Sequence, residues 1–246
     1  VYEKNMAINV LIGKLSQNSE DESGQHILAH LLVQENDNDQ ETANIAITRG
    51  LQNKASWVTK SFTFFAKSRN EDIRNAGNLL LLRCLLNEIP EAQKIIINFA
   101  NSDDLYESDV ADSILFKTVL CPPFYNSDWA KTILVDLSKS DVVNRRKVAA
   151  KAFCKGLYMF DWPMGISSVE IPAKDWFYSQ FTNLLDSNND HEIHTAAHIF
   201  YSLLEKGRAY DAFYSFAKDF DVKKQNLAVA VLLEGILYGA EIVDGI

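Results

Sequence analysis

Apolar residues at helical spacing are the feature that most constrains what this chain can fold into. They recur every three or four residues along the whole sequence, as in Ile73, Leu80 and Leu85 or in Phe177 and Phe181. Short breaks rich in Ser, Asp and Asn separate these segments, and such residues favour helix N-termini. No segment alternates as a half-buried strand does. We therefore expect an all-α fold with about thirteen helices.

The composition agrees with a helical globular chain. Among 246 residues there are only 10 glycines and 5 prolines, so few positions break a helix. Hydrophobic residues make up 47% and charged residues 23%, which is a globular balance and not that of a disordered chain. No apolar run reaches the ~18 residues of a membrane span. Helix signals continue throughout, which predicts a single domain over residues 1–246.

Five segments share one spacing, in which a small residue follows a capping position by seven residues. The segments begin at Glu22, Asn70, Val142, Asp190 and Asp221, and their small residues are Ala29, Gly77, Ala149, Ala197 and Ala228. A small side chain lets neighbouring helices approach closely where helix pairs stack. The pattern therefore predicts an array of similar helical units.

In these segments the chain resembles the HEAT-repeat family, whose second helix reads roughly Asp-x-x-Val-Arg-x-x-Ala-x-x-Ala-Leu. The best matches are Arg146 to Phe153 and the pair Ile73-Arg74. The resemblance implies an α-solenoid of about six HEAT-like antiparallel helix pairs. Other copies hold His or Gln at the Arg position, so an ARM-like or another paired-helix array stays open. The resemblance implies a fold and no activity.

Two segments interrupt the repeat and contain four of the five prolines. They are Cys121 to Asn126 and Phe160 to Pro172. Insertions in helical arrays often serve binding, which makes their aromatic residues candidate partner contacts. Those residues are Phe124, Tyr125, Phe160 and Trp162. An alternative is that the second segment folds back over the end of the core.

The charge of the chain points to a basic partner. The formal net charge is -9, which disfavours binding to nucleic acid and attracts cationic surfaces. The acidic residues of the predicted partner site are Asp103, Asp104, Glu107 and Asp109. Capping and the helix dipole also explain acids at such positions.

One basic concentration offers an alternative nucleic-acid contact. It comprises Arg145, Arg146, Lys147, Lys151 and Lys155. The three lysines lie on one helix face, as a phosphate-binding stripe would. The competing interpretation is a solvated helix side paired with acids of neighbouring units.

Histidines at i, i+4 spacing suggest a metal site only weakly. The candidates are His191, His194 and His198. His26 and His30 occupy the same repeat positions as His194 and His198, so the repeat explains their spacing. We expect no metal and no cofactor. Three cysteines without a paired motif indicate reduced thiols and a cytoplasmic setting.

The leading hypothesis is a non-enzymatic module that binds a protein through an acidic helical surface. One version is an immunity or inhibitor protein that neutralises a basic, nuclease-like toxin. The sequence lacks Gly-rich phosphate loops, GxSxG and HExxH, which favours binding over catalysis. The alternatives are a HEAT-like DNA-repair glycosylase that uses residues 145–155, and a HEAT-like lyase or small-molecule carrier with a pocket near Trp162 and Trp176.

Overall fold

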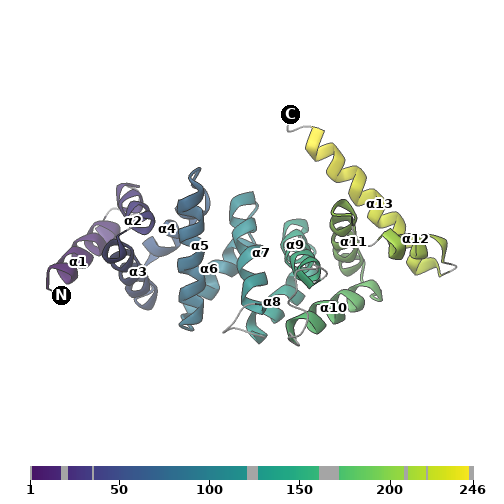
Figure 1. The fold of residues 1–246 in the computed structure, drawn as a ribbon, viewed down its shortest axis with the longest axis horizontal. Coiled ribbons are helices and arrows are strands. Elements are labelled where there is room, and N and C mark those ends of the chain that lie inside the picture. Colours follow the sequence, from purple (N-terminus) through teal and green to yellow (C-terminus); the bar gives the residue numbers. More distant parts are fainter. Residues whose placement is uncertain are drawn as a thin grey trace. The chain divides into compact units, whose positions relative to one another are not determined.

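A computed structural model describes residues 2–17, 22–34, 36–120, 127–160, 172–207, 210–219 and 221–243. Within these ranges it contains thirteen α-helices and no strand (Figure 1), which confirms the all-α prediction. The helices are α1 (Tyr2–Gln17), α2 (Ser23–Val33), α3 (Asp37–Gln52), α4 (Ser56–Ala66), α5 (Glu71–Leu86), α6 (Pro90–Ala100), α7 (Leu105–Leu120), α8 (Asp128–Ser138), α9 (Val143–Phe160), α10 (Pro172–Leu185), α11 (Asp190–Glu205), α12 (Tyr210–Lys218) and α13 (Val222–Val243). No described helix is both long enough and apolar enough to cross a bilayer.

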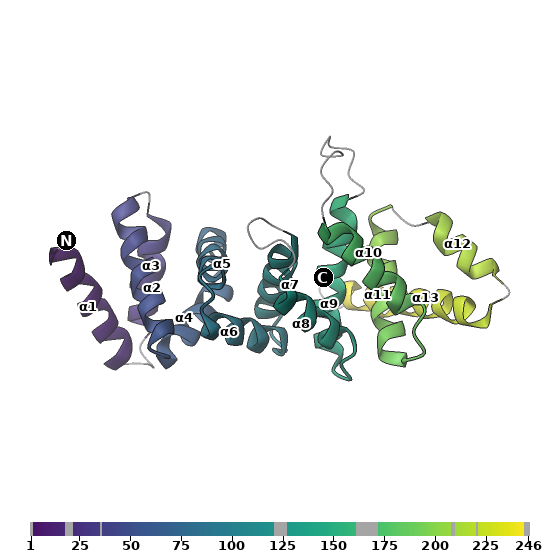
Figure 2. The same ribbon diagram turned by 90° about the horizontal axis from the view of Figure 1, so that it is seen from below.

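Short and long helices alternate after α1. The short helices α2, α4, α6 and α8 each have 11 residues, whereas α3, α5, α7 and α11 each have 16. Helices α9 and α13 are longer, with 18 and 22 residues. The described chain thus forms six pairs, each with a short helix followed by a long one. Figure 2 shows the same alternation from a second direction.

Five of the six long helices begin in the same way, and the exception is α9, which has Val142 at the cap position. The side chains of Asn36, Asn70 and Asp104 accept hydrogen bonds from the backbone N–H two residues later, at 2.8–3.0 Å. Asn189 and Asp221 do the same at the starts of α11 and α13. These bonds satisfy backbone donors that the first turn leaves unpaired. The first three caps are 34 residues apart in sequence, which is shorter than the 40–47 residues of a HEAT pair.

The structure corrects the register of the repeat. Copies lie in all six long helices, including α3, where the sequence comparison found none, and α7, where it left room for a looser copy near Asp109 to Phe116. The segment from Glu22 belongs to the short helix α2 instead. In α11 the cap is Asn189 and not Asp190, which moves its small residue from Ala197 to Ala196.

The seventh residue after each cap position is small and buried in every long helix. These residues are Ala43, Gly77, Ala111, Ala149, Ala196 and Ala228. At Gly77 an added Cβ would lie 2.7 Å from Cβ of Phe65, on the short helix of the same pair. At Gly50, in α3, it would lie 2.5 Å from the ring of Trp57, which is in α4 of the next pair. Helices therefore approach closely at a glycine both within a pair and between neighbouring pairs.

The turns from long to short helices also repeat. Lys54 and Glu88 both adopt φ 54°, and Gly207 adopts φ 74° at the matching position after α11. After α3 the N–H of Ala55 bonds to the Gly50 carbonyl, and after α5 the N–H of Ile89 bonds to that of Cys84. A left-handed residue closes a helix and redirects the chain within a few residues.

Contacts divide the chain into two compact units, Val1–Ile114 and Leu115–Ile246. In unit 1, α2 packs against α1, α3 and α5, over a core that includes Trp57, Phe62 and Phe65. In unit 2, α11 packs against α8, α9, α10 and α13. There the Phe153 ring stacks on Trp176 at 5.6 Å and meets Phe177 edge-on at 5.8 Å. Trp176 thus belongs to the aromatic core of unit 2.

The substitution Gly77→Ala tests the close approach inside a pair. The new methyl group meets Phe65, and we expect a loss of about 1–3 kcal/mol in the free energy of unfolding. The matched control is Gly13→Ala in α1, where no atom lies within 4 Å of the added Cβ. That change should stabilise by about 0.5–1 kcal/mol through helix propensity. Urea unfolding followed by circular dichroism measures both, and equal effects would contradict the packing.

Candidate functional site

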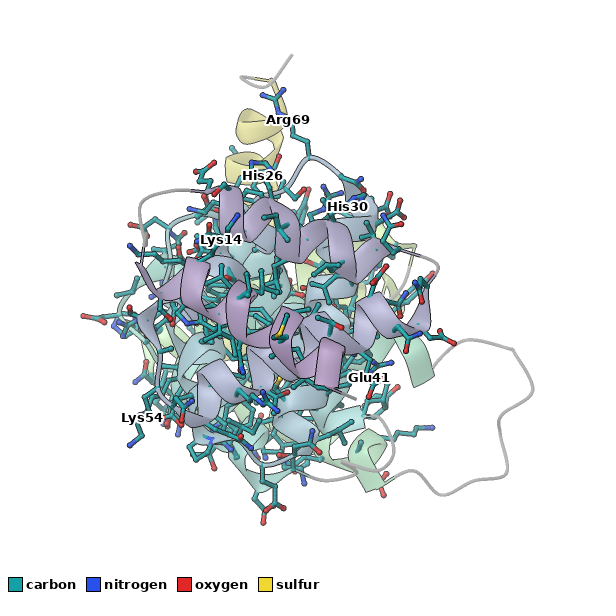
Figure 3. All side chains as sticks on the ribbon, turned by 90° about the vertical axis from the view of Figure 1, so that its left-hand side faces the viewer. Lys14, His26, His30, Glu41, Lys54 and Arg69 are labelled. Carbon is teal, nitrogen blue, oxygen red and sulfur yellow. The ribbon has the colours of Figure 1, made fainter. Side chains whose placement is uncertain are left out.

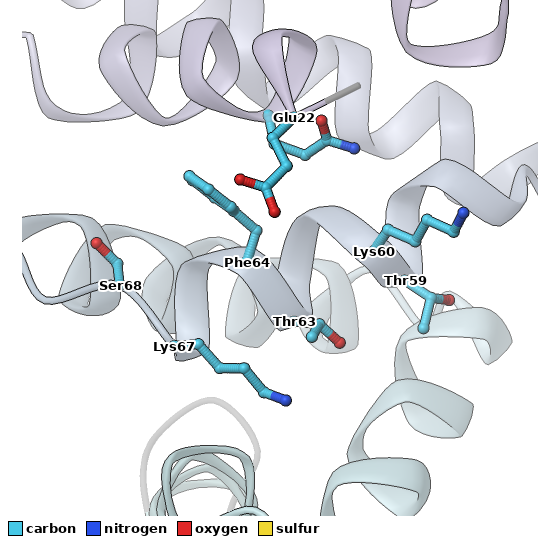
Figure 4. A pocket seen from close by; sticks show the side chains of 8 residues that line it. Glu22, Thr59, Lys60, Thr63, Phe64, Lys67 and Ser68 are labelled. Atoms are coloured by element: carbon cyan, nitrogen blue, oxygen red, sulfur yellow. The ribbon is translucent and has the colours of Figure 1, made fainter. Parts of the chain in front are cut away.

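A cleft of about 430 Å³ lies between α2 and α4 in unit 1 (Figure 4). Its lining residues are Glu22, Gln25, Thr59, Lys60, Thr63, Phe64, Lys67 and Ser68. The α4 residues of the lining are spaced by three and four, so they form one face of that helix. The opposite face of α4 buries Val58, Phe62 and Phe65. The amphipathic pattern of α4 therefore turns a polar face toward the cleft.

Phe64 supplies the aromatic surface of the cleft. Its ring is half-buried and meets the His26 ring edge-on, with centroids 4.8 Å apart. His26 in turn lies 4.0 Å from the Glu22 carboxylate. His26 and His30 are one turn apart on α2, and Figure 3 labels both. These contacts hold the Phe64 ring at the wall of the cleft.

Lys67 joins one end of the cleft to the start of α7. Its ammonium lies 3.1 Å from Asp104 and 3.4 Å from Glu107. The hydrogen bond that Lys67 donates to Asp104 and the charges of Glu107 and Asp104 raise the pKa of Lys67, against the effect of burial. Burial raises the pKa of Asp104, but its bonds to Lys67 and to two backbone N–H groups outweigh this and lower it overall. Asp104 thus caps α7 and anchors α4 at once.

The acidic residues predicted to bind a partner divide into two kinds. Glu107 is buried and Asp104 is partly buried, and both hold Lys67. Asp103 and Asp109 are exposed. Two of these four carboxylates therefore lie at the surface.

The aromatic residues predicted to bind a partner fall at the limits of the described chain. Phe124, Tyr125 and Trp162 lie outside the described residues. Phe160 ends α9, and its side chain also lies outside the description. Their role stays a prediction.

The basic residues 145–155 of unit 2 make contacts within the protein. The Arg146 guanidinium donates to the carbonyls of Ser140 and Asp141 at 2.8 and 2.9 Å, and lies 3.4 Å from Nδ1 of His191. Lys147, Lys151 and Lys155 are half-buried, and each has an interaction of its own. Arg145 is half-buried too, and its Nε has no hydrogen-bond partner within the described parts.

The position of Arg146 has one structural role in several pairs. Arg74 donates to the Ser68 carbonyl at 2.6 Å, and Gln40 and Gln225 bond to carbonyls six residues earlier at 2.7 and 2.8 Å. In each case the fourth residue after the cap position braces the turn that precedes a long helix. Sequence reasoning singled out this position as basic but did not find its partner carbonyl.

His194 and His198 both face Glu234 of α13, each at 3.7 Å. Burial raises the pKa of Glu234, whereas the bond to His198 and the charges of His198, His194 and Lys147 lower it below its ordinary value. Among the described residues no group of three His, Cys, Asp or Glu side chains could hold a metal ion. The histidines join α11 to α13.

The substitution Glu234→Gln tests this junction. A lowered pKa means that the folded protein binds fewer protons here than the unfolded chain. The carboxylate's contribution is therefore present above its ordinary value of 4.5 and is lost as the pH falls through the lower folded value. We expect the variant to be less stable by on the order of 1 kcal/mol near pH 6 and equal to wild type in acid. Exposed Glu71→Gln is the control, and a pH-independent gap would contradict the assignment.

The buried thiols give a second test. Burial raises the pKa of Cys84 to about 11, against a weaker effect of its bond to Thr48. Burial also raises the pKa of Cys154, although Lys206 opposes it. Because the thiolate is the reactive form, both should resist alkylation in the native protein at pH 8 and react once it is unfolded. Peptide mapping by mass spectrometry reads this out, and rapid native labelling of Cys84 would contradict its placement.

The comparisons with known proteins assign no family. No family model matches the chain, and no curated protein matches it. Among solved structures, it is similar to an engineered protein from the Northeast Structural Genomics Consortium, with 14% sequence identity over 85% of this chain and 96% of that chain. The TM-score of 0.29 is too low for this likeness to carry an argument about fold or function.

Proposed function

We propose that this chain is a non-enzymatic protein-binding module, and that unit 1 holds its partner at the cleft between α2 and α4. The observation that carries the proposal is the composition of that cleft. Hydroxyl groups of Thr59, Thr63 and Ser68 and the amide of Gln25 surround a single aromatic ring, that of Phe64. Hydroxyl and amide groups around one aromatic ring suit the amides of an extended polypeptide and one apolar side chain.

The net charge of -9 favours a basic partner, although the cleft lining itself contains Lys60 and Lys67 beside Glu22. Asp104 and Glu107 bind Lys67, and their sequence neighbours Asp103 and Asp109 are exposed. Further exposed acids begin the long helices of unit 1, at Asp37 and at Glu71. Acids in first turns are stabilised by the helix dipole and also steer cationic partners. An immunity or inhibitor protein acting on a basic, nuclease-like toxin is one concrete form of this function.

The described residues give the nucleic-acid alternative no support. Arg146 is bonded to backbone carbonyls, and the three lysines of the stripe are half-buried with interactions of their own. A phosphate-binding face instead presents its cations to solvent. The small-molecule alternative near Trp176 is likewise unsupported, because that ring is stacked in the core of unit 2.

Charge reversal at the acidic end of the cleft tests the proposal. The probes are fluorescent peptides of matched length that are Lys/Arg-rich, neutral or Asp/Glu-rich, and binding is measured by anisotropy. We expect only the basic peptide to bind, with a weaker Kd at higher salt. The double variant Asp103→Lys, Asp109→Lys should weaken binding by at least about tenfold. The matched control is Asp128→Lys, Asp136→Lys, which reverses two exposed acids of α8 and should change Kd by less than about threefold.

A second pair of variants separates the cleft from general charge. Thr63→Arg places a bulky cation in the cleft, and Thr132→Arg places the same residue on the exposed face of α8. We expect the first to abolish peptide binding and the second to leave most of it. Binding of the neutral peptide as tightly as the basic one, or equal losses in both threonine variants, would contradict the proposal.

A further inference from the structure

The cleft between α2 and α4 brings a carboxylate and an aromatic ring together. Figure 4 shows the Glu22 carboxylate and the Phe64 ring pointing toward each other, the first from the start of α2 and the second from α4. His26 contacts both groups, since its ring centroid lies 4.8 Å from that of Phe64 and its Nε2 lies 4.0 Å from the Glu22 carboxylate. We call this part of the cleft the Glu22–Phe64 corner.

The Glu22–Phe64 corner is open to a partner. The Glu22 side chain is 75% exposed, and Phe64 is only half-buried. Glu22 holds the cap position of α2, but its side chain makes no capping hydrogen bond. Its carboxylate instead points into the cleft. Gln25, which also lines the cleft, is buried and gives the wall a fixed polar group.

The two lysines of the cleft lining do not occupy this corner. In Figure 4 the ammonium groups of Lys60 and Lys67 point away from Glu22 and from the Phe64 ring. Lys67 is bound by two carboxylates, at 3.1 and 3.4 Å, which together outweigh its charge. Lys60 is exposed, so solvent and salt screen it. His26 adds a positive charge only when it is protonated. The charge that a partner meets at the corner is therefore that of Glu22.

Arginine is the side chain that satisfies both groups of the corner at once. Its planar guanidinium stacks on aromatic rings and forms paired hydrogen bonds with a carboxylate. Its stem is apolar and suits the Phe64 ring. Lysine offers a strongly hydrated point charge without the planar fork. An aliphatic side chain would contact Phe64 but leave Glu22 without a cation.

We propose that the Glu22–Phe64 corner binds one arginine side chain of the partner, with the guanidinium held between the ring and the carboxylate. The inference rests on the proposed function, because it names the residue of a basic partner that the cleft recognises. It adds a specificity that net charge does not give. A lysine-rich partner is attracted by the same charge but lacks the group that fits the corner.

Peptides that differ at one position test the proposal. They are fluorescent, share one lysine-rich sequence and carry Arg, Lys, citrulline or Leu at the central position, and anisotropy measures each Kd. Citrulline has the shape of arginine without its charge. We expect the Arg peptide to bind at least about fivefold more tightly than each of the others.

Two substitutions in the corner should remove this preference. Glu22→Gln keeps the size of an exposed side chain and removes its charge, and Phe64→Leu removes the ring and keeps an apolar group. In both variants we expect the Kd values of the Arg and Lys peptides to differ by less than about twofold. Binding of the Lys peptide shows that each variant is folded. The matched controls Glu71→Gln and Tyr214→Leu change an exposed acid of α5 and an exposed ring of α12, and should keep the preference of wild type.

The outcomes separate this inference from the proposed function. Equal Kd values for all the peptides, or a preference for Arg that persists in both corner variants, would overturn the arginine site and leave binding of a basic partner standing. Loss of the preference in the controls as well would do the same. If none of the peptides binds, the proposed function fails and the arginine site fails with it.

Discussion

The fold depends on one steric constraint, which is that the seventh residue after the cap position of each long helix is small and lies where helices pack together. Ala43, Gly77, Ala111, Ala149, Ala196 and Ala228 all satisfy it. At Gly77 the Phe65 side chain occupies the space of a Cβ, so the short helix lies directly on the long one. Because this contact orients α4, its polar face with Thr59 and Thr63 points away from the core and lines the cleft.

A second recurring feature is a set of hydrogen bonds in the turns before the long helices. It explains why some charged residues do not form a binding site. In α3, α5 and α13 a capping Asn or Asp precedes the long helix, and Arg or Gln four residues later bonds to the carbonyl six residues before it. Arg146 makes the same bond in α9, where Val142 holds the cap position. Charged and polar side chains are thereby used in the turns between pairs. Asp104 has two such roles, since it caps α7 and also binds Lys67. The acidic residues exposed at the surface include Asp103 and Asp109.

The sequence predicted the helices well, because spacing and capping are local properties. It also located the small residues Gly77, Ala149 and Ala228. It missed the copy at Ala43 in α3 and placed a segment of the short helix α2 in the repeat instead. The cleft could not be predicted, since its threonines and lysines resemble an ordinary solvated helix face. The contact between Lys67 and Asp104 is tertiary, and neither spacing nor composition encodes it.

The short-long helix pair is the structural unit of unit 1, with a period of 34 residues between the caps Asn36, Asn70 and Asp104. Deleting residues 36–69 removes one period and brings Asn70 to the place of Asn36. Urea unfolding of this variant, followed by circular dichroism, is the decisive measurement. We expect a single cooperative transition at lower urea and an unchanged helical signal per residue. Loss of the cooperative transition, or a helical signal no better than after deleting residues 36–63, would contradict it.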